Sequence, residues 1–257
     1  MAHLVSEIYY LEEEYEQCRD LLEVALTHPN IQPLEVVIKG RLLGIESRLG
    51  NDKRFNELRK ELTEKEDDTE ALLFLAIQDR RDGNFDQAIE KLKKCLTKAH
   101  VVSINTYREE LAYTYISCER FLSAIDEYIL LIGEQHNHPL MKTVIELQWD
   151  LQNYFSAYMR AKAYREAGGE EWVKYSCYFE VGYLMANSSW EEAKEVLLLL
   201  RREETENQLF LLDLLGAECN LGNLTEARNL ENEIDTTKLN QGAMEYYLNL
   251  KKKFLGE

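Results

Sequence analysis

Two histidines, His136 and His138, are the side chains of this 257-residue sequence that first suggest metal chemistry. A His-x-His pair supplies two imidazole ligands, but a zinc site needs a third and usually a fourth ligand from Cys, His, Asp or Glu. No carboxylate or thiol is spaced to complete such a site, and the pair stands in a polar stretch before Pro139. We therefore expect the two histidines to begin a loop, and we predict neither a metal nor a cofactor.

The five cysteines suggest a compartment rather than a reaction. Cys18, Cys95, Cys118, Cys177 and Cys219 form no Cys-x-x-Cys pair and are too few for a disulfide scaffold. Cysteines spread in this way are typical of small buried hydrophobic side chains. No apolar run approaches ~18 residues, and no cationic segment followed by an apolar run is present at the start. These features predict a cytoplasmic location without membrane insertion.

Catalysis and nucleic-acid binding are both disfavoured. The sequence contains no glycine-rich phosphate loop, no nucleophile elbow and no Ser/His/Asp arrangement. Thirty Lys and Arg residues stand against 47 Asp and Glu residues, and the net charge of −17 opposes binding to a phosphate backbone or an anionic membrane. Acidity by itself also serves simply to keep a protein in solution. The sequence therefore predicts no enzyme and no nucleic-acid partner.

The side chains that remain for binding must be positioned by helices, and the stretch 69–102 shows the helical pattern most clearly. It reads as two amphipathic helices joined by Gly83 and Asn84. Helix axes approach to roughly 8–10 Å only where a side chain is small, and Ala76 and Ala88 are small residues on the facing stripes. Leu72 and its apolar neighbours fill the space around them, and charged residues occupy the opposite face.

This stretch resembles one tetratricopeptide repeat. Leu72, Leu75 and Ala76 on the first helix and Ala88 on the second match the pattern of that family, whereas Asp79 departs from its tyrosine. The small residue of the second helix recurs at intervals of 36, 33, 36 and 34 residues, near the family period of about 34, at Ala88, Ala124, Ala157, Ala193 and Ala227.

The resemblance implies an all-α fold, a right-handed α-solenoid that forms a single domain over residues 1–257. Only three prolines occur, all between the periodic segments, and no sustained alternation of apolar and polar residues predicts a strand. We expect about seven helix hairpins, at 3–30, 33–66, 69–102, 104–138, 139–169, 171–204 and 207–236. A capping helix at 239–255 follows them, apolar on one face and lysine-rich on the other.

In this family the first helices of successive hairpins line a concave groove. The predicted register places a set of apolar, aromatic and arginine residues there: Leu73, Ile77, Arg80, Arg81, Tyr113, Trp149, Tyr175, Tyr178, Met185 and Leu212. Rings of this kind are typical binding anchors, and the two arginines would favour a ligand with an acidic group. Alternatively the rings pack between hairpins, because a register error of one residue rotates each by about 100°.

These features favour a protein-interaction scaffold or adaptor that binds a peptide or a partner helix in the groove. The alternative is an assembly subunit that forms a homo-oligomer or docks onto another helical-repeat protein. An enzyme with an unrecognised site is a third class, for which the sequence offers no residues.

Overall fold

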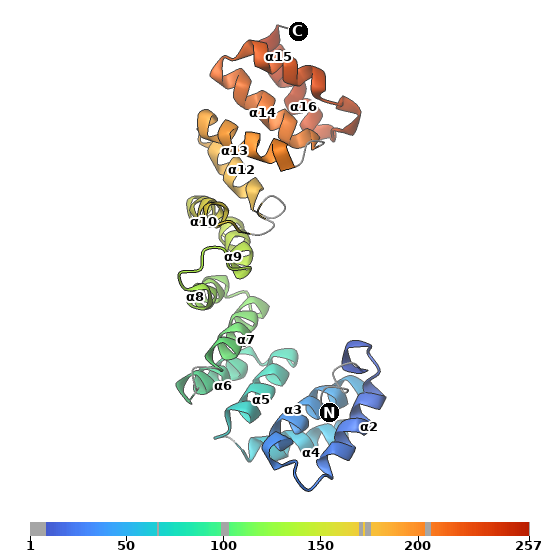
Figure 1. The fold of residues 1–257 in the computed structure, drawn as a ribbon. Helices are drawn as coiled ribbons and strands as arrows, with labels where there is room; N and C mark the ends of the chain where they lie inside the picture. Colours follow the sequence, from blue (N-terminus) through green and yellow to red (C-terminus); the bar gives the residue numbers. More distant parts are fainter. Residues whose placement is uncertain are drawn as a thin grey trace. The chain divides into compact units, whose positions relative to one another are not determined.

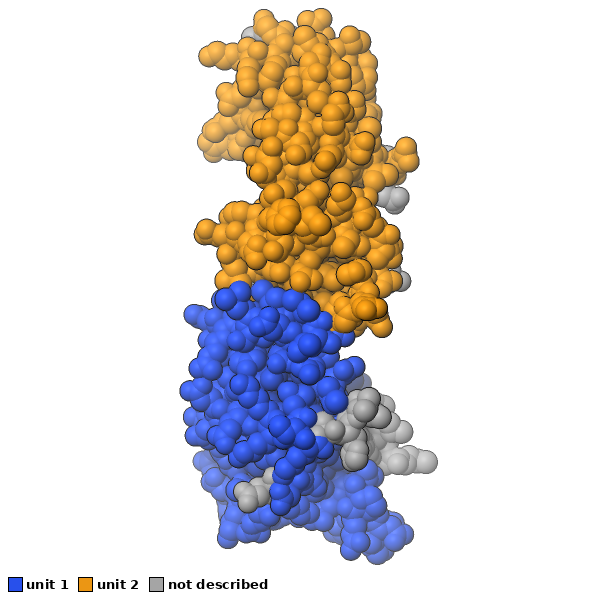
Figure 2. Space-filling model, turned by 90° about the vertical axis from the view of Figure 1, so that its left-hand side faces the viewer, with its two compact units in different colours: residues 1–131 blue, residues 132–257 orange. Residues whose placement is uncertain are grey.

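The structure is a computed structural model that describes residues 9–65, 67–98, 103–169, 172, 176–203 and 207–256. These residues form helices joined by short turns, and none of them lies in a β-strand, which confirms the predicted all-α fold. The chain divides into two compact units, residues 1–131 (unit 1) and residues 132–257 (unit 2), which Figure 2 shows in different colours. One domain over residues 1–257 stays a prediction.

Unit 1 is a series of helix hairpins (Figure 1). Consecutive helices from α2 to α7 contact each other, and the first helices α3, α5 and α7 also contact in sequence. The elements are α2 (Tyr15–Leu26), the 3₁₀ turn η1 (Gln32–Leu34), α3 (Glu35–Leu49), α4 (Asp52–Thr63), α5 (Thr69–Arg81), α6 (Phe85–Lys98), α7 (Ile104–Ser117) and α8 (Phe121–Ile132), whose last residue crosses the unit boundary.

Unit 2 repeats the arrangement and ends in the predicted capping helix (Figure 1). Consecutive helices contact each other from α12 to α15, α10 contacts both α9 and α12, and α16 packs on α14. The elements are α9 (Leu140–Asp150), α10 (Tyr154–Glu166), α12 (Cys177–Ala186), α13 (Trp190–Glu203), α14 (Gln208–Leu221), α15 (Leu224–Glu233), the 3₁₀ turn η2 (Thr236–Lys238), α16 (Gln241–Leu250) and its π-helical continuation η3 (Lys251–Leu255).

The same turn closes the hairpins of both units. Between α5 and α6 the Asn84 amide donates to the Asp79 carbonyl at 2.7 Å, and between α14 and α15 the Asn223 amide donates to the Glu218 carbonyl at 3.0 Å. This closure requires one residue in the left-handed region, which glycine adopts without steric cost. Glycine supplies it at Gly50, Gly83 and Gly222, whereas Glu119, Gln152 and Ser188 adopt it as non-glycine residues with φ near 60°.

The small residue that marks each second helix lies where two helices meet. Ala88, Ala124, Ala157, Ala193 and Ala227 are all fully buried. Each amide donates to the carbonyl four residues earlier, at the start of its helix. The predicted contact position on the second helices is therefore confirmed at these five alanines.

Buried acids replace the family's tyrosine at two turns. Asp79 is 1% exposed, and its carboxylate accepts from Arg59 of α4 at 2.7 Å and from Lys91 of α6 at 2.5 Å. Glu218 of α14 stands at the equivalent place in unit 2 and pairs with Lys194 of α13 at 3.0 Å. A buried carboxylate needs such partners, so the departure from the family pattern at Asp79 joins three helices by charge.

Candidate binding surface on the first helices

The predicted groove residues separate into buried and accessible groups. Leu73 and Leu212 are only 7% and 2% exposed, so they belong to the core and cannot line a groove as we expected. Leu73 packs in the apolar cluster that α5, α6 and α7 share. Tyr175 lies outside the described residues.

Arg80 is engaged between two first helices. Its Nη2 donates to the Glu110 carboxylate of α7 at 3.0 Å, and its Nε is buried. The guanidinium therefore joins α5 to α7, rather than standing ready for an acidic ligand.

Trp149 joins two first helices in the same manner in unit 2. Its ring lies 4.8 Å from the Tyr154 ring of α10 and 5.2 Å from the Phe179 ring of α12. A side chain at Gly182 of α12 would begin 3.3 Å from the indole. Trp149 and Arg80 both stand eight residues before the buried alanine of their hairpin. For Trp149 the structure therefore agrees with the alternative expectation from the sequence, in which a ring packs between hairpins and does not line a groove.

Two predicted tyrosines keep much of their surface accessible. Tyr113 of α7 is 42% exposed and meets the Tyr128 ring edge-on at 6.5 Å. Tyr178 of α12 is 49% exposed, and its ring lies 5.4 Å from that of Phe210 in α14. Met185 is half-buried. Each unit therefore presents one tyrosine on a first helix, supported from behind by another ring.

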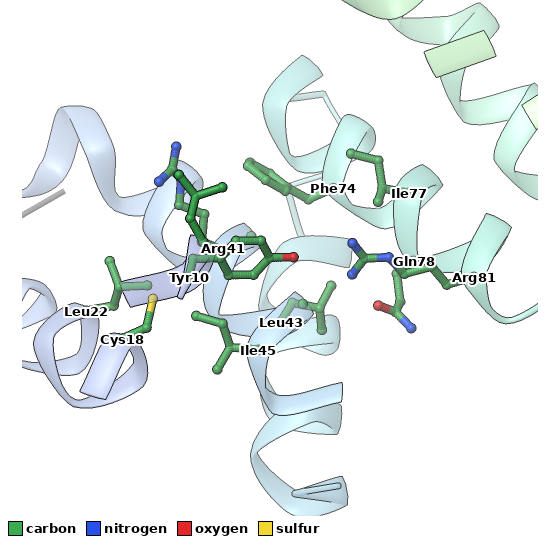
Figure 3. Close-up of a pocket in the computed structure, with 13 residues that line it drawn as sticks. Tyr10, Cys18, Leu22, Arg41, Leu43, Ile45, Phe74, Ile77, Gln78 and Arg81 are labelled. Carbon is green, nitrogen blue, oxygen red and sulfur yellow. The ribbon is translucent and has the colours of Figure 1, made fainter. Parts of the chain in front are cut away.

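Unit 1 also contains a pocket of about 340 Å³ (Figure 3). Its walls come from α2, α3, α5 and the residues just before α2, and most of them are apolar. The lining residues are Tyr10, Leu11, Cys18, Leu22, Gly40, Arg41, Leu43, Gly44, Ile45, Phe74, Ile77, Gln78 and Arg81. Two of them, Ile77 and Arg81, are among the predicted groove residues.

Two glycines inside α3 shape this pocket. A Cβ on Gly40 would lie 2.1 Å from the Phe74 ring, so the ring rests directly on the α3 backbone. A Cβ on Gly44, one turn later, would lie 3.2 Å from the Arg81 guanidinium and would meet no other atom within 4 Å among the residues that the structure describes. Glycine inside a helix costs roughly 0.5–1 kcal/mol relative to alanine. Phe74 occupies the space at Gly40, whereas the space at Gly44 stays largely open.

Tyr10 of the pocket is held by a residue that lies outside it. Arg48 donates to the Tyr15 hydroxyl at 2.9 Å and lies over the rings of Tyr15 and Tyr10, which fixes Tyr10 at the rim. Burial raises the pKa of the Cys18 thiol, an effect that the nearby Arg41 partly opposes. The thiol is therefore an apolar wall and not a nucleophile.

Gln78 is the most deeply placed polar residue of the pocket. It is 2% exposed, and its Nε2 donates to the Asp82 carboxylate at 2.7 Å and to the Ser47 hydroxyl at 3.4 Å. A carboxylate only accepts hydrogen bonds, so this contact fixes which end of the amide is the nitrogen. The opposite atom, Oε1, is buried and accepts no hydrogen bond from any residue that the structure describes. In Figure 3 it is turned toward Leu43.

Sequence reasoning missed Gly40, Gly44, Phe74 and Gln78. The two glycines carried a signal, because they fall inside the first helix of the hairpin predicted at 33–66, and a glycine inside a helix often has a packing or functional reason. Phe74 and Gln78 carried none, since an aromatic ring and an amide are common on any helix.

The remaining sequence candidates form no separate site. His138 accepts the Leu140 amide on its Nδ1 at 3.1 Å, which places it at the start of α9. The described residues include no group of three or more potential metal ligands. None of the helices among them is long and apolar enough to cross a membrane.

No protein-family model and no curated protein sequence matches the chain. Among solved structures it is similar to PilF of Pseudomonas aeruginosa, with 14% identity, a TM-score of 0.53 and coverage of 83% of this chain and 93% of that one. Naa15/Naa10 bound to HypK-THB matches with 15% identity and a TM-score of 0.59, over 98% of this chain and 38% of that one. The apo form of RapI matches with 12% identity and a TM-score of 0.54, over 100% and 81%. The fold is that of tetratricopeptide-repeat proteins.

Proposed function

We propose that this chain is a protein-interaction module whose first helices bind a peptide or a helix of a partner protein. The observation that carries the proposal is the pocket of unit 1. It is an apolar hollow beside Gly44, and filling it from α3 would require only a side chain at that position. Concave apolar sites with a few polar groups are where proteins bind ligands.

Three further residues support contact with a partner beyond the pocket. Tyr113 and Tyr178 are exposed rings on first helices, and Met185 lies on α12 with Tyr178. Tyrosine is enriched at interface hot spots because it combines a large apolar area with one polar end. We retain Tyr175 in the proposed surface, and we assign Arg80 and Trp149 to packing between hairpins.

The module is proposed to act without catalysis or a cofactor, in the cytoplasm. Five cysteines present as thiols are compatible with a reducing compartment. The charge of −17 makes nucleic acid an unfavourable partner.

An assembly subunit is the second candidate function. The observation that favours it is a group of exposed apolar side chains around the start of α10: Leu151, Tyr154, Phe155 and Met159. Light scattering of the wild-type chain and of Phe155→Glu would test it, because a dimer that uses this group should dissociate in the variant.

The proposed function is tested by photo-crosslinking from two positions of one hairpin. A photoreactive phenylalanine analogue replaces Ile77 on first helix α5 or, as the control, Glu90 on second helix α6. We expect a crosslink to a discrete protein from position 77 and none from position 90. Equal crosslinking from both positions would contradict binding on the first helices.

A further inference from the structure

We propose that Asp213, on first helix α14 of unit 2, binds a lysine or arginine side chain of the partner protein. The inference rests on the proposed function and names the charge of the segment that the module binds in unit 2. It follows from a carboxylate that has no cation, from the contact that other first helices make at the same place, and from the side chains beside it.

Asp213 lacks the partner that the buried acids of unit 2 have. Glu180 pairs with Arg165 at 2.8 Å, and Glu218 pairs with Lys194 at 3.0 Å. Asp213 forms no hydrogen bond or ion pair with any residue that the structure describes, and burial raises its pKa to about 6. It is only half-buried, and its oxygens are not among the fully buried polar atoms, so a ligand can reach them. A carboxylate in this position gains free energy when a cation approaches it.

Successive first helices meet at a fixed place in the repeat. The residue eight positions before the buried alanine of one hairpin meets the residue fourteen positions before the buried alanine of the next. In unit 1 this contact is the ion pair of Arg80 with Glu110 at 3.0 Å. In unit 2 it is the contact of Trp149 with Phe179, whose ring centroids lie 5.2 Å apart. A charge pair and a ring pair therefore serve the same purpose at two places in the chain.

The next pair at this place consists of Met185 on α12 and Asp213 on α14. The two helices are neighbours, since the ring centroids of Tyr178 on α12 and Phe210 on α14 lie 5.4 Å apart. Met185 is half-buried and carries no charge. Unit 2 therefore has the carboxylate of the unit 1 ion pair without its arginine, and a cation from a partner would complete the pair.

The side chains that flank Asp213 on α14 suit the apolar stem of a long cationic residue. Leu209, one turn earlier, is 42% exposed. One turn later the Tyr246 hydroxyl of α16 rests on the backbone at Gly216, where it would overlap with an added Cβ. Burial, together with the nearby Asp213 charge, raises the pKa of Tyr246 to about 12, so this hydroxyl stays protonated. Lysine and arginine lay their stems along apolar surface and keep the charged end at a polar group.

The charge of the whole chain favours the same class of ligand. A net charge of −17 attracts cationic segments and repels acidic ones. This attraction acts over the entire surface, so a test of the inference has to separate it from contact with Asp213.

The probe is a labelled peptide titrated against the full chain by fluorescence anisotropy. It is capped at both ends and has Leu-Lys-Leu at its centre, with Gly and Ser on each side. Matched peptides replace the lysine by arginine, by Glu, or by Nε-acetyl-lysine, which keeps a similar length and loses the charge. We expect the Lys and Arg peptides to bind about tenfold or more tightly than the acetyl-lysine peptide, and the Glu peptide to bind most weakly.

One protein variant removes the proposed contact. Asp213→Asn keeps the shape of the side chain without its charge and should reduce the preference for Lys over acetyl-lysine to about twofold, the part that the net charge supplies. It should not unfold the chain, because it also removes the cost of holding a charge away from water. The control is Glu195→Gln, which removes the same charge from an exposed position of second helix α13 and should leave the preference intact.

A second variant supplies the missing cation from within the chain. Met185→Arg should pair with Asp213, as Arg80 pairs with Glu110, and should abolish the preference while the carboxylate remains. Its control, Met185→Gln, introduces a polar side chain without a charge and should keep the preference. Thermal melts of every variant identify those that are folded.

The inference is overturned if the Lys and acetyl-lysine peptides bind equally, or if the preference survives in Asp213→Asn or Met185→Arg. It is also overturned if no peptide of the set binds while position 77 still crosslinks to a discrete protein, and in that case the proposed function stands. Equal crosslinking from positions 77 and 90, with a Lys preference that requires Asp213, would instead contradict the proposed function and support this contact.

Discussion

The two units treat the same position of a first helix in opposite ways. Phe55 starts its second helix with the same hydrogen bond as Ala193, from its amide to the carbonyl four residues earlier. Gly44 stands eleven residues before Phe55 and Gly182 eleven residues before Ala193, so both glycines occupy one place in the repeat. In unit 2 the Trp149 ring fills the space at Gly182, where an added Cβ would lie 3.3 Å from the indole, and it joins α9 to α12. In unit 1 the tip of Arg81 is the one described side-chain group that an added Cβ on Gly44 would meet within 4 Å, and a pocket remains beside it.

The comparison shows that a helix glycine acquires its role from the neighbouring helix. Both glycines lower the intrinsic stability of their helices by roughly 0.5–1 kcal/mol relative to alanine. Ring packing offsets this loss in unit 2. In unit 1 no packed ring does so at Gly44, and the open volume is available to a ligand.

The largest expected effect concerns a position where the units should not differ. Ala124 and Ala157 are fully buried at the same place of their hairpins. Ala124→Glu or Ala157→Glu should cost at least about 4 kcal/mol, from overpacking together with desolvation of a charge. Urea unfolding followed by circular dichroism should show loss of the cooperative transition in either unit. Leu122→Glu, at a site that is 70% exposed, is the control and should change little. A normal transition in one of the two variants would break the equivalence of the units.

A smaller effect on stability should distinguish the packed Trp149 of unit 2 from the pocket wall of unit 1. Trp149→Ala removes the ring that fills the space at Gly182 and should lower the free energy of unfolding by about 3 kcal/mol. Ile77→Ala removes a half-buried side chain beside the pocket, where contacts are fewer, and should cost about 1 kcal/mol. Both values come from urea titration at one pH. Equal losses would show that the pocket wall is packed as tightly as the Trp149 contact.

A half-buried carboxylate gives the stability of unit 2 a pH dependence. Burial raises the pKa of Asp213 on α14 to about 6, above its unfolded value of about 3.9. The folded state therefore holds this proton more tightly, so its contribution to stability is present below pH 4 and is lost as the pH rises through 6. Asp213→Asn should remove that loss and raise the free energy of unfolding at pH 7.5 by about 2 kcal/mol. Urea titrations at pH 4.5 and 7.5 measure it, with Asp150→Asn on exposed surface as the control. An unchanged pH profile in Asp213→Asn would contradict the prediction.

The smallest expected effect returns to the two glycines. Gly44→Ala should raise the free energy of unfolding by about 0.5–1 kcal/mol, because the new methyl group meets only the flexible end of Arg81. Gly182→Ala should gain less, since its methyl group must fit against the indole of Trp149. Thermal unfolding of the two variants compares them under identical conditions. A larger gain for Gly182→Ala would reverse our account of which position is open.

Much of the fold was predictable because it depends on local periodicity. The 3.6-residue stripes placed the hairpins, and the spacing of Ala88, Ala124 and Ala157 placed their contacts, since only a small side chain lets two helices approach. The candidate site was predictable only in part. Ile77 and Arg81 line the pocket, and Tyr113 and Tyr178 are exposed. Leu73 and Leu212 are buried because one helix face touches both its partner helix and the next hairpin.

By itself, the sequence determined the helical class, the repeat and its turns, because periodicity and glycine placement act within a few residues. Tertiary structure decided which side chains of the first helices are used in packing and which remain for binding. Arg80 pairs with Glu110 thirty residues away, while Arg81 beside it reaches a pocket. Consecutive helix residues point about 100° apart, so Arg80 reaches α7 and Arg81 reaches α3, and only the packed structure decides what each side chain meets there.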